Sequence, residues 1–281
     1  MTSHAAVTDR GPSLIGAGVA RIRYEVIGYF RSADTVFFTF LFPLVMLGIF
    51  TAAFSASGDI VPSPGAEGVS VGAYYLPGML AAGILLSGVQ NLAVDIAGEK
   101  SDGTLKRLGG TPLSPVSYFI GKIGQVFVTG VLQALLLLLA AVLLFGIELP
   151  TDGASWATFA WVFVFGIITS ALLGIALSSV PRTGRSATAV VIPIVLVLQF
   201  ISGVYLQFYQ LPEWMQNIAS VFPLKWIAQG MRAVFLPQSF ETLEVGGEWN
   251  LGGVAVALAV WLVVGLVLSR LRFRWVRRSG L

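Results

Sequence analysis

The sequence contains no cysteine and only one histidine, His4. The lack of cysteine excludes disulfide bonds, thiol nucleophiles and thiolate metal sites. Charge is scarce as well, because Asp, Glu, Lys and Arg make up 11% of the 281 residues, against about 25% in an average soluble domain. Hydrophobic residues make up 56%. This composition predicts an integral membrane protein.

A nucleotide-binding motif is also missing. A phosphate-binding loop follows the pattern G-x-x-x-x-G-K-[S/T], and here Gly121-Lys122 is followed by Ile123. The apolar stretches hold no histidine or lysine that could serve a serine nucleophile as a base. We therefore predict that the chain is not an enzyme, and that any ATP-driven function uses a partner that hydrolyses the nucleotide.

Six long stretches without Asp, Glu, Lys or Arg predict an all-α polytopic membrane protein. A spanning helix needs about 20 mostly apolar residues, and these stretches have 21 to 29. They are Thr35–Gly58, Gly68–Val94, Ile123–Ile147, Gly153–Pro181, Ser186–Pro212 and Trp249–Ser269. We place the six transmembrane helices at about 36–56, 73–94, 122–146, 156–179, 187–209 and 250–270, within one permease domain over 35–271.

The positive charges predict how the chain is oriented. With six spans, 15 of the 17 Lys and Arg residues fall on the side that holds both termini, and the positive-inside rule makes that side cytoplasmic. The exceptions are Lys225 and Arg232. The chain should therefore lie in the cytoplasmic membrane with both termini inside. Because this asymmetry accounts for the basic charge, we expect no nucleic-acid partner.

Two further segments lie outside the spans. The cytoplasmic segment 1–34 contains apolar residues at helical spacing, which predict an amphipathic helix that lies in the membrane interface or packs on the protein's own surface; these are Ile15, Val19, Ile22, Val26 and Tyr29. Between spans five and six, the apolar segment Trp214–Leu236 is broken by Pro212 and Pro223. It predicts two short re-entrant external helices. Residues 272–281 form a basic cytoplasmic tail.

The span interiors lack ionisable residues, which argues against a proton-driven carrier. An electrically neutral pathway would suit hydrophobic drugs, lipids or lipid-linked glycans. From polarity and position, we select Phe42, Gln199, Ser202 and Tyr205 as pathway residues. Hydrogen bonds between helices, or an aromatic belt, explain such residues equally well.

The cytoplasmic connection between spans two and three has charges alternating with leucine. A short helix from about Gly103 to Leu108 would project a leucine and basic side chains, and a solvated loop is the alternative. The connection reads E-K-x-x-G-T-L-K-R-L from Glu99, then T-P-L-S and Y-x-x-G-K. These motifs resemble the permease of type-2 ATP-binding-cassette (ABC) exporters, most closely the daunorubicin-type drug and natural-product branch. A second block agrees: Ser202-Gly203-Val204-Tyr205, Leu211-Pro212-Glu213-Trp214-Met215, Phe222-Pro223-Leu224 and Arg232.

The resemblance implies a permease that works with a separate ABC ATP-binding subunit. ATP and Mg would bind that subunit, and this chain would hold no cofactor or metal. Two permeases, either two copies or this chain and a related one, would export a small hydrophobic substrate from the cytosol or the membrane lipids. The implied coupling residues are Glu99, Lys100, Gly103, Thr104, Leu105, Lys106, Arg107 and Leu108.

Alternatives from other classes stay open. A partner-free channel or sodium-coupled carrier would use the polar groups within the uncharged spans. A membrane-embedded enzyme would need a catalytic set such as Asp95 and Glu99, for which the spacing gives no support. Within the family, a lipid-linked glycan or polysaccharide exporter is a further alternative.

Overall fold

The computed structural model describes residues 13–181 and 183–272. The first twelve residues, Arg182 and the predicted basic tail after Arg272 lie outside the described residues. Within them the fold is helical, and the only bridge between extended segments joins Ile60 to Val69.

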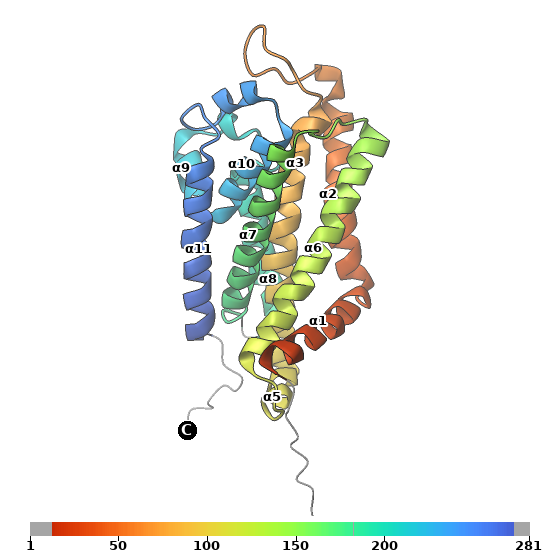
Figure 1. The fold of residues 1–281 in the computed structure, drawn as a ribbon, viewed down its shortest axis with the longest axis vertical. Coiled ribbons are helices and arrows are strands. Elements are labelled where there is room, and N and C mark those ends of the chain that lie inside the picture. Colours follow the sequence, from red (N-terminus) through yellow and green to blue (C-terminus); the bar gives the residue numbers. More distant parts are fainter. Residues whose placement is uncertain (1–12, 182, 273–281) are drawn as a thin grey trace, which may run out of the picture.

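Six helices of the described chain are long and apolar enough to cross a membrane, as predicted. They run side by side along the long axis of the molecule (Figure 1). The second consists of α3 (Val71–Leu85), the π-helix η2 (Leu86–Asn91) and α4 (Leu92–Ser101). The others are α2 (Ala33–Phe54), α6 (Pro115–Phe145), α7 (Gly153–Leu177), α8 (Gly184–Ile201) and α11 (Leu251–Arg272).

The helix ends differ from the ends of the charge-free stretches. The second membrane-length helix runs on to Ser101, and α6 begins at Pro115, where the Ser114 hydroxyl accepts a hydrogen bond of 3.0 Å from the Ser117 amide. The charge-free stretch marks only the part of a helix that can face hydrocarbon, and the helix continues wherever its charged side chains find partners. The membrane-length helices therefore contain ionisable residues, and these lie on turns beyond the charge-free stretches.

The fifth span is shorter than predicted. Helix α8 ends at Ile201 rather than near residue 209. Ser202 and Gly203 turn the chain, and Gly203 has a φ of 77°, which a residue with a Cβ rarely adopts. The chain continues through the short helix η3 (Phe208–Gln210).

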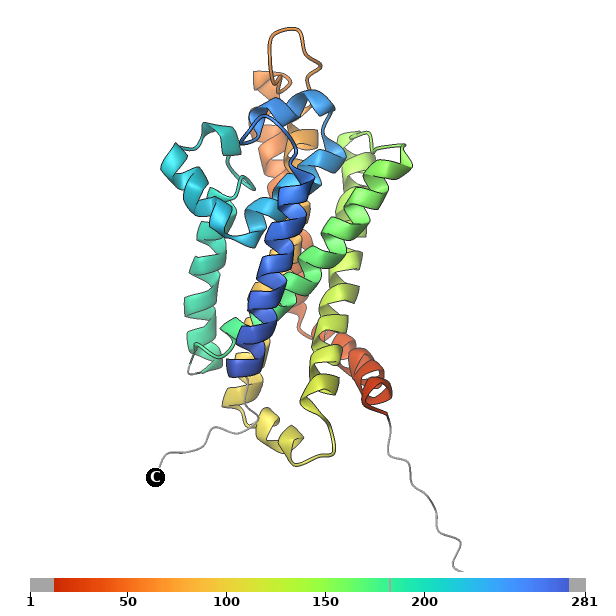
Figure 2. The same ribbon diagram turned by 60° about the vertical axis from the view of Figure 1, so that its left-hand side comes forward.

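The second membrane-length helix forms the centre of the bundle. Within its most apolar window 78% of the residues are buried, against 17% for both α2 and α11 and 22% for α8. Leu76, Met79 and Ile84 of α3 are fully enclosed. Helices α2, α8 and α11 lie at the outside (Figures 1 and 2) and leave apolar side chains exposed, as hydrocarbon or a further helix would require.

Two glycines allow η2 and α7 to make their closest contact. A Cβ on Gly174 would lie 2.1 Å from the carbonyl oxygen of Gly88, and a Cβ on Gly88 would lie 2.5 Å from the Cβ of Ser170. Neither distance is sterically possible without movement of a backbone. Small residues permit such close helix packing in membranes, where packing rather than hydrophobic burial holds helices together.

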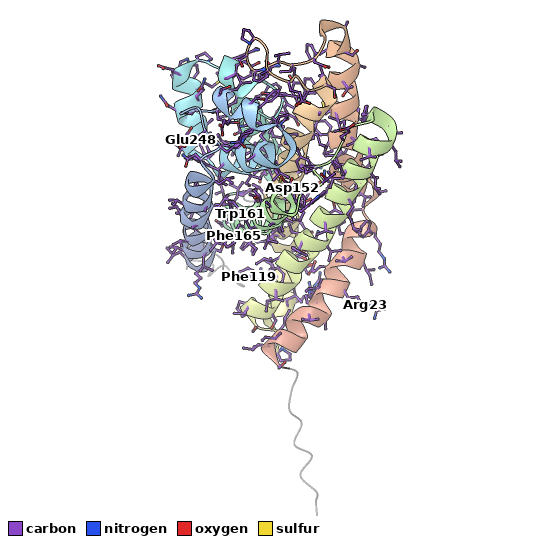
Figure 3. The ribbon with its side chains drawn as sticks, turned by 45° about the horizontal axis from the view of Figure 1, so that its top comes forward. Arg23, Phe119, Asp152, Trp161, Phe165 and Glu248 are labelled. Atoms are coloured by element: carbon purple, nitrogen blue, oxygen red, sulfur yellow. The ribbon has the colours of Figure 1, made fainter. Side chains whose placement is uncertain are left out.

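Helix α1 (Leu14–Phe30) packs along the first turns of α6. A Cβ on Gly121 or Gly124 of α6 would meet Arg21 or Ile22 at 2.4 Å. Of the predicted apolar face, Ile22, Val26 and Tyr29 are half-buried whereas Ile15 and Val19 are exposed, and Glu25, outside that face, is buried. Arg23 lies on the outward side of the helix (Figure 3).

The remaining helices are short. Helix α5 (Thr104–Gly109) lies at the same end of the bundle as α1, and the opposite end carries α9 (Glu213–Val221) and α10 (Pro223–Phe235) (Figure 1). We call these the α5 end and the α10 end. Helix α10 packs against α3, α7 and α11 and buries Leu224, Ile227 and Met231. Two short 3₁₀-helices are η1 (Ser55–Ser57) and η4 (Gln238–Leu243).

Substitution of Gly174 by alanine should destabilise the bundle. The added methyl group forces α7 and η2 apart, and such overpacking costs about 1–3 kcal/mol. We expect a lower melting temperature for purified Gly174→Ala in detergent. Gly252→Ala is the matched control, because Gly252 is exposed in α11 and has open space around its Cα. Equal melting temperatures for the two variants would contradict the contact.

Candidate functional site

A cavity of about 740 Å³ lies between α1, α2, the η2–α4 segment, α6 and α8. This volume is within the range of about 300–1,000 Å³ in which proteins bind drug-sized molecules. Phe38 and Phe42 of α2 and Ile192 and Leu196 of α8 form an apolar part of its wall. The π-helix η2 contributes polar side chains, and π-helical segments often occur at functional sites.

Four carboxylates line the cavity, from Glu25, Asp34, Asp95 and Glu99, and the described lining contains neither lysine nor arginine. This cavity is therefore not electrically neutral, and its use as the substrate pathway stays a prediction. Two of the carboxylates lie on the turns by which α4 extends past the apolar stretch, and Glu25 is brought to the wall by α1. The charge-free stretches of the sequence, taken alone, place Glu25, Asp95 and Glu99 outside the predicted spans.

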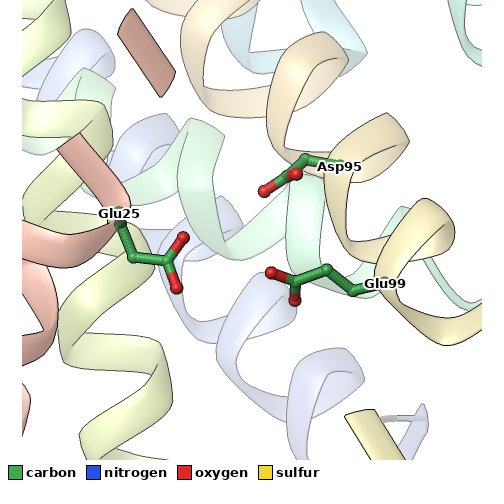
Figure 4. Close-up of side chains that lie close together, drawn as sticks. All are labelled: Glu25, Asp95 and Glu99. Carbon is green, nitrogen blue, oxygen red and sulfur yellow. The ribbon is translucent and has the colours of Figure 1, made fainter. Parts of the chain in front are cut away.

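A buried ion cluster joins three helices beside this cavity. The fully buried Lys122 ammonium of α6 lies 2.5 Å from Asp95 Oδ2, 2.9 Å from Glu99 Oε1 and 2.7 Å from Glu25 Oε2. The three carboxylates converge from α1 and α4 (Figure 4). A buried ion is costly unless it is paired and hydrogen-bonded, and here each charge of the cluster has a partner on another helix.

Two further groups complete the cluster. Arg21 Nε donates a hydrogen bond of 2.6 Å to Glu25 Oε1, and the Tyr118 hydroxyl donates one of 2.5 Å to Glu99 Oε2. Three carboxylates thus face two cations. Asp95 is the most open of them, with 53% of its side chain exposed. The cluster therefore leaves negative charge at this part of the cavity.

The three carboxylates also have the spacing of a metal site. One oxygen from each of Glu25, Asp95 and Glu99 lies within 4.8 Å of the other two. The Lys122 ammonium donates to all three residues. A metal ion would have to displace this internal cation.

Helix α5 begins one residue later than predicted and is preceded by a sharp turn. Gly103 has a φ of 81°, a conformation that favours glycine. Asp102 Oδ1 accepts a hydrogen bond of 2.8 Å from the Thr104 amide. Hydrogen bonds from Thr104 lower the pKa of Asp102, so this carboxylate remains an ionised acceptor at the start of α5.

The two leucines of α5 face inward rather than outward. Leu105 is buried, and Leu108 is half-buried against the core. Lys106 and Arg107 are exposed, and an Arg107 guanidinium nitrogen donates to the Thr104 hydroxyl at 3.1 Å. The predicted projection of a leucine is therefore wrong, because the leucines anchor the helix, and the exposed face is basic.

The predicted coupling residues divide between two helices. Glu99 and Lys100 belong to the last turns of α4, and Glu99 faces the ion cluster rather than the outer surface of α5. Gly103 lies in the turn, and the others lie on α5. Their role in coupling stays a prediction.

The four predicted pathway residues do not all reach the cavity. Phe42 and Gln199 line it, whereas Ser202 and Tyr205 are buried behind the wall. The Tyr205 hydroxyl donates a hydrogen bond of 2.8 Å to Gln199 Oε1, so Tyr205 is linked to the cavity through Gln199. Burial raises the pKa of Tyr205 to about 12. Passage of a substrate past these residues remains a prediction.

The sequence-based reasoning missed the ion cluster. Asp95 and Glu99 are four residues apart and share one face of a helix, as do Arg21 and Glu25. This spacing predicts that each pair of charged side chains lies on one side of its helix, where it can contact a neighbouring helix. The partner of both pairs, Lys122, is 97 residues from Glu25, and the sequence identifies it as a cytoplasmic charge and as the last residue of the Y-x-x-G-K motif, but not as an ion-pair partner.

A second polar group lies at the α10 end. Arg232 of α10 forms a buried ion pair with Glu244, and Lys225 donates to Gln229 Oε1. The Lys225 ammonium lies 3.9 Å from the centre of the Trp226 ring, a cation–π contact. Burial lowers the pKa of Lys225 to about 8.

Six membrane-length helices, of which α2, the second one, α6 and α8 line the cavity, indicate an integral membrane protein. Residues 59–271, more than half of the chain, match the family described as ABC-2 family transporter protein. The chain belongs to the ABC-2 transporter family, whose members form the membrane component of ABC transporters.

Two curated relatives are similar to this chain. One is named uncharacterized protein YhgE of Bacillus subtilis, 29% identical over 57% of this chain and 19% of the relative. The other is named probable multidrug ABC transporter permease YbhR of Escherichia coli, 24% identical over 63% of this chain and 48% of the relative. The matched part thus spans less than half the length of either relative.

Replacement of Lys122 by methionine should strongly destabilise the protein. The change leaves the carboxylates of α1 and α4 without their shared cation, and loss of one partner of a buried ion pair costs about 3–5 kcal/mol. Chemical denaturation of purified Lys122→Met in detergent measures the loss. The deficit should shrink in acid, because protonation of the carboxylates removes their repulsion.

Lys106→Met is the control for this prediction, since Lys106 is exposed on α5. It should leave stability within about 0.5 kcal/mol of the original chain, as most surface substitutions do. A similar small effect for Lys122→Met would show that the cluster does not hold α1, α4 and α6 together.

Proposed function

We propose that this chain is the permease subunit of an ABC exporter. It moves a hydrophobic or amphipathic molecule out across the cytoplasmic membrane, and a separate ATP-binding subunit supplies the energy. Helix α5 carries the proposal, because it is anchored by Leu105 and presents Lys106 and Arg107 at the end of the bundle. Membership of the ABC-2 family supports the same function.

Helix α5 acts as the coupling helix that docks on the ATP-binding subunit. It lies between α4 and α6 in the chain, and both helices wall the cavity. The bonds of Glu99 to Tyr118 and Lys122 tie these two helices together. ATP binding to the partner subunit would therefore move α5, and the ion-paired helices α4 and α6 would pass this movement to the cavity wall. In this proposal α4 and α6 have two positions, one before and one after ATP binds.

The α5 end faces the cytoplasm in this proposal. Arg23 lies at the α5 end, whereas Asp152 and Glu248 lie nearer the α10 end (Figure 3). Basic residues are retained on the cytoplasmic side of a membrane. ATP is available on that side, so this orientation also places α5 where an ATP-binding subunit can reach it.

Helices outside the spans fit the two membrane interfaces. On α1 the exposed apolar residues Ile15, Val19 and Ile27 occur together with exposed Arg23, as in a helix that lies in the interface. At the other end, α10 packs within the bundle. We propose that α9 and α10 form the external re-entrant segment, with their backbones covered by protein.

A working transporter would contain two permeases, either two copies of this chain or this chain and a related one. The exposed apolar sides of α2 and α8 flank the cavity and would face the second permease. A cavity of about 740 Å³ favours a drug-sized molecule over a polysaccharide. The name of YbhR, a probable multidrug ABC transporter permease, agrees with a drug-sized substrate.

Charge reversal on α5 should abolish binding of the ATP-binding subunit. We expect the tagged chain to co-purify with an ABC ATP-binding subunit from gently solubilised membranes. The double variant Lys106→Glu and Arg107→Glu should lose it, because both exposed charges at the contact change sign. Mass spectrometry of the purified material measures this.

The double variant Arg270→Glu and Arg272→Glu is the matched control. It makes the same charge change on exposed residues at the α5 end of α11 and should retain the partner. Recovery of the folded chain alone, from the original sequence, would contradict the proposal and favour a partner-free channel or carrier. Retention of the partner by the α5 variant would exclude α5 as the coupling helix.

A further inference from the structure

We propose that the cavity selects amphipathic organic cations, which bind with their charged group against Asp95 and their apolar body between α2 and α8. The inference rests on the proposed function, because it names the substrate class of the exporter. Binding itself depends only on the cavity, so it can be tested without an ATP-binding subunit.

Charge is the first observation. The cavity wall holds four carboxylates, and its described lining contains neither lysine nor arginine. Lys122 and Arg21 offset part of this charge from behind the wall, but they face three carboxylates in the cluster. Asp34 adds a fourth at the N-terminus of α2. A cation gains attraction in such a site, and an anion is repelled.

Asp95 is placed to contact the cation directly. Its Oδ2 atom bonds to Lys122, whereas Oδ1 bonds to no described residue. Its side chain is half exposed, and it lines the cavity. Glu25 and Glu99 have both of their oxygens bonded within the cluster, so Asp95 is the carboxylate of the cluster that is free to take a ligand.

The wall changes from acidic to apolar along α2. Asp34, Phe38 and Phe42 are spaced by four residues and line the same cavity. At a rise of 1.5 Å per residue this series spans about 12 Å, which is the length of a drug-sized molecule. The phenyl rings can contact an aromatic or aliphatic body and attract positive charge by their faces. The order of groups matches a molecule with one charged end.

An unpaired amide is the second, independent sign of a ligand. Gln199 lines the cavity near the end of α8 and is 2% exposed. Its Oε1 accepts from Tyr205, but its Nε2 has no hydrogen-bond partner among the described residues. A buried donor without an acceptor costs free energy, and a ligand that carries one acceptor atom on the part of its body far from the cationic group would remove that cost.

Two ions of the same size and opposite charge test the selectivity. Tetraphenylphosphonium is a cation, and tetraphenylborate is an anion with the same four phenyl groups. Equilibrium dialysis measures their binding to the full chain in phosphatidylcholine nanodiscs, with empty nanodiscs subtracted. We expect the cation to bind at least about tenfold more tightly than the anion, as one added charge contact allows.

Asp95→Asn should remove most of that preference. The substitution leaves two carboxylates facing two cations in the cluster, so the fold should remain stable while the cavity loses its accessible charge. Phe42→Ala should instead weaken both ions to a similar extent, because it removes apolar contact only. Glu67→Gln is the control, since Glu67 is exposed in the loop before α3, and it should leave both affinities unchanged.

The outcomes separate this inference from the proposed function. A preference for the cation that Asp95→Asn reduces about tenfold supports the inference, whether or not an ATP-binding subunit co-purifies. Equal binding of the two ions, tighter binding of the anion, or binding of neither overturns it. If any of these results accompanies recovery of the ATP-binding subunit, the exporter function stands and only the substrate class is wrong.

Discussion

The ammonium group of Lys122 holds together helices whose other charges repel. Without it, Glu25 of α1 would face two carboxylates of α4 with no shared cation, and α6 would keep the hydrogen bond from the Tyr118 hydroxyl to Glu99. This cation links α1 and α6 to α4 at the end of the cavity, in addition to the packing of α1 on Gly121 and Gly124 of α6. Its value is architectural, because a buried ion that links three helices allows few other arrangements.

This cluster also explains why α5 can serve a mechanical role. The helices before and after α5, α4 and α6, are joined by the ion pair of Glu99 with Lys122, and Leu105 fixes the apolar side of α5 to the core. A force on the exposed basic face therefore meets a connected structure rather than a loose loop. Farther along, the backbone contact of Gly88 with Gly174 joins the same central helix to α7. The second membrane-length helix is thus held at one end by an ion cluster and farther along by close backbone packing.

Sequence reasoning succeeded where one local property decides the structure. Hydrocarbon excludes charge, so the charge-free stretches identified six spans, and Pro212 and Pro223 marked the short helices α9 and α10. It failed where the outcome depends on distant partners. Asp95, Glu99 and Lys122 were assigned to a connection because a single charge in a membrane helix is costly, but that cost falls when charges from α1, α4 and α6 meet. The four-residue spacing marks the charged faces of α1 and α4, but no local pattern identifies Lys122 as their shared partner.

The π-helix η2 determines which way the side chains of α4 point around the helix axis. Its wider turns insert extra residues between α3, which faces the core, and α4, which faces the cavity. In a regular helix each residue turns the chain by about 100°. Removal of one residue from Leu86–Asn91 would therefore rotate α4 by roughly that angle and carry Asp95 and Glu99 away from Lys122. In this region the length of the chain, and not only its chemistry, determines where the charges point.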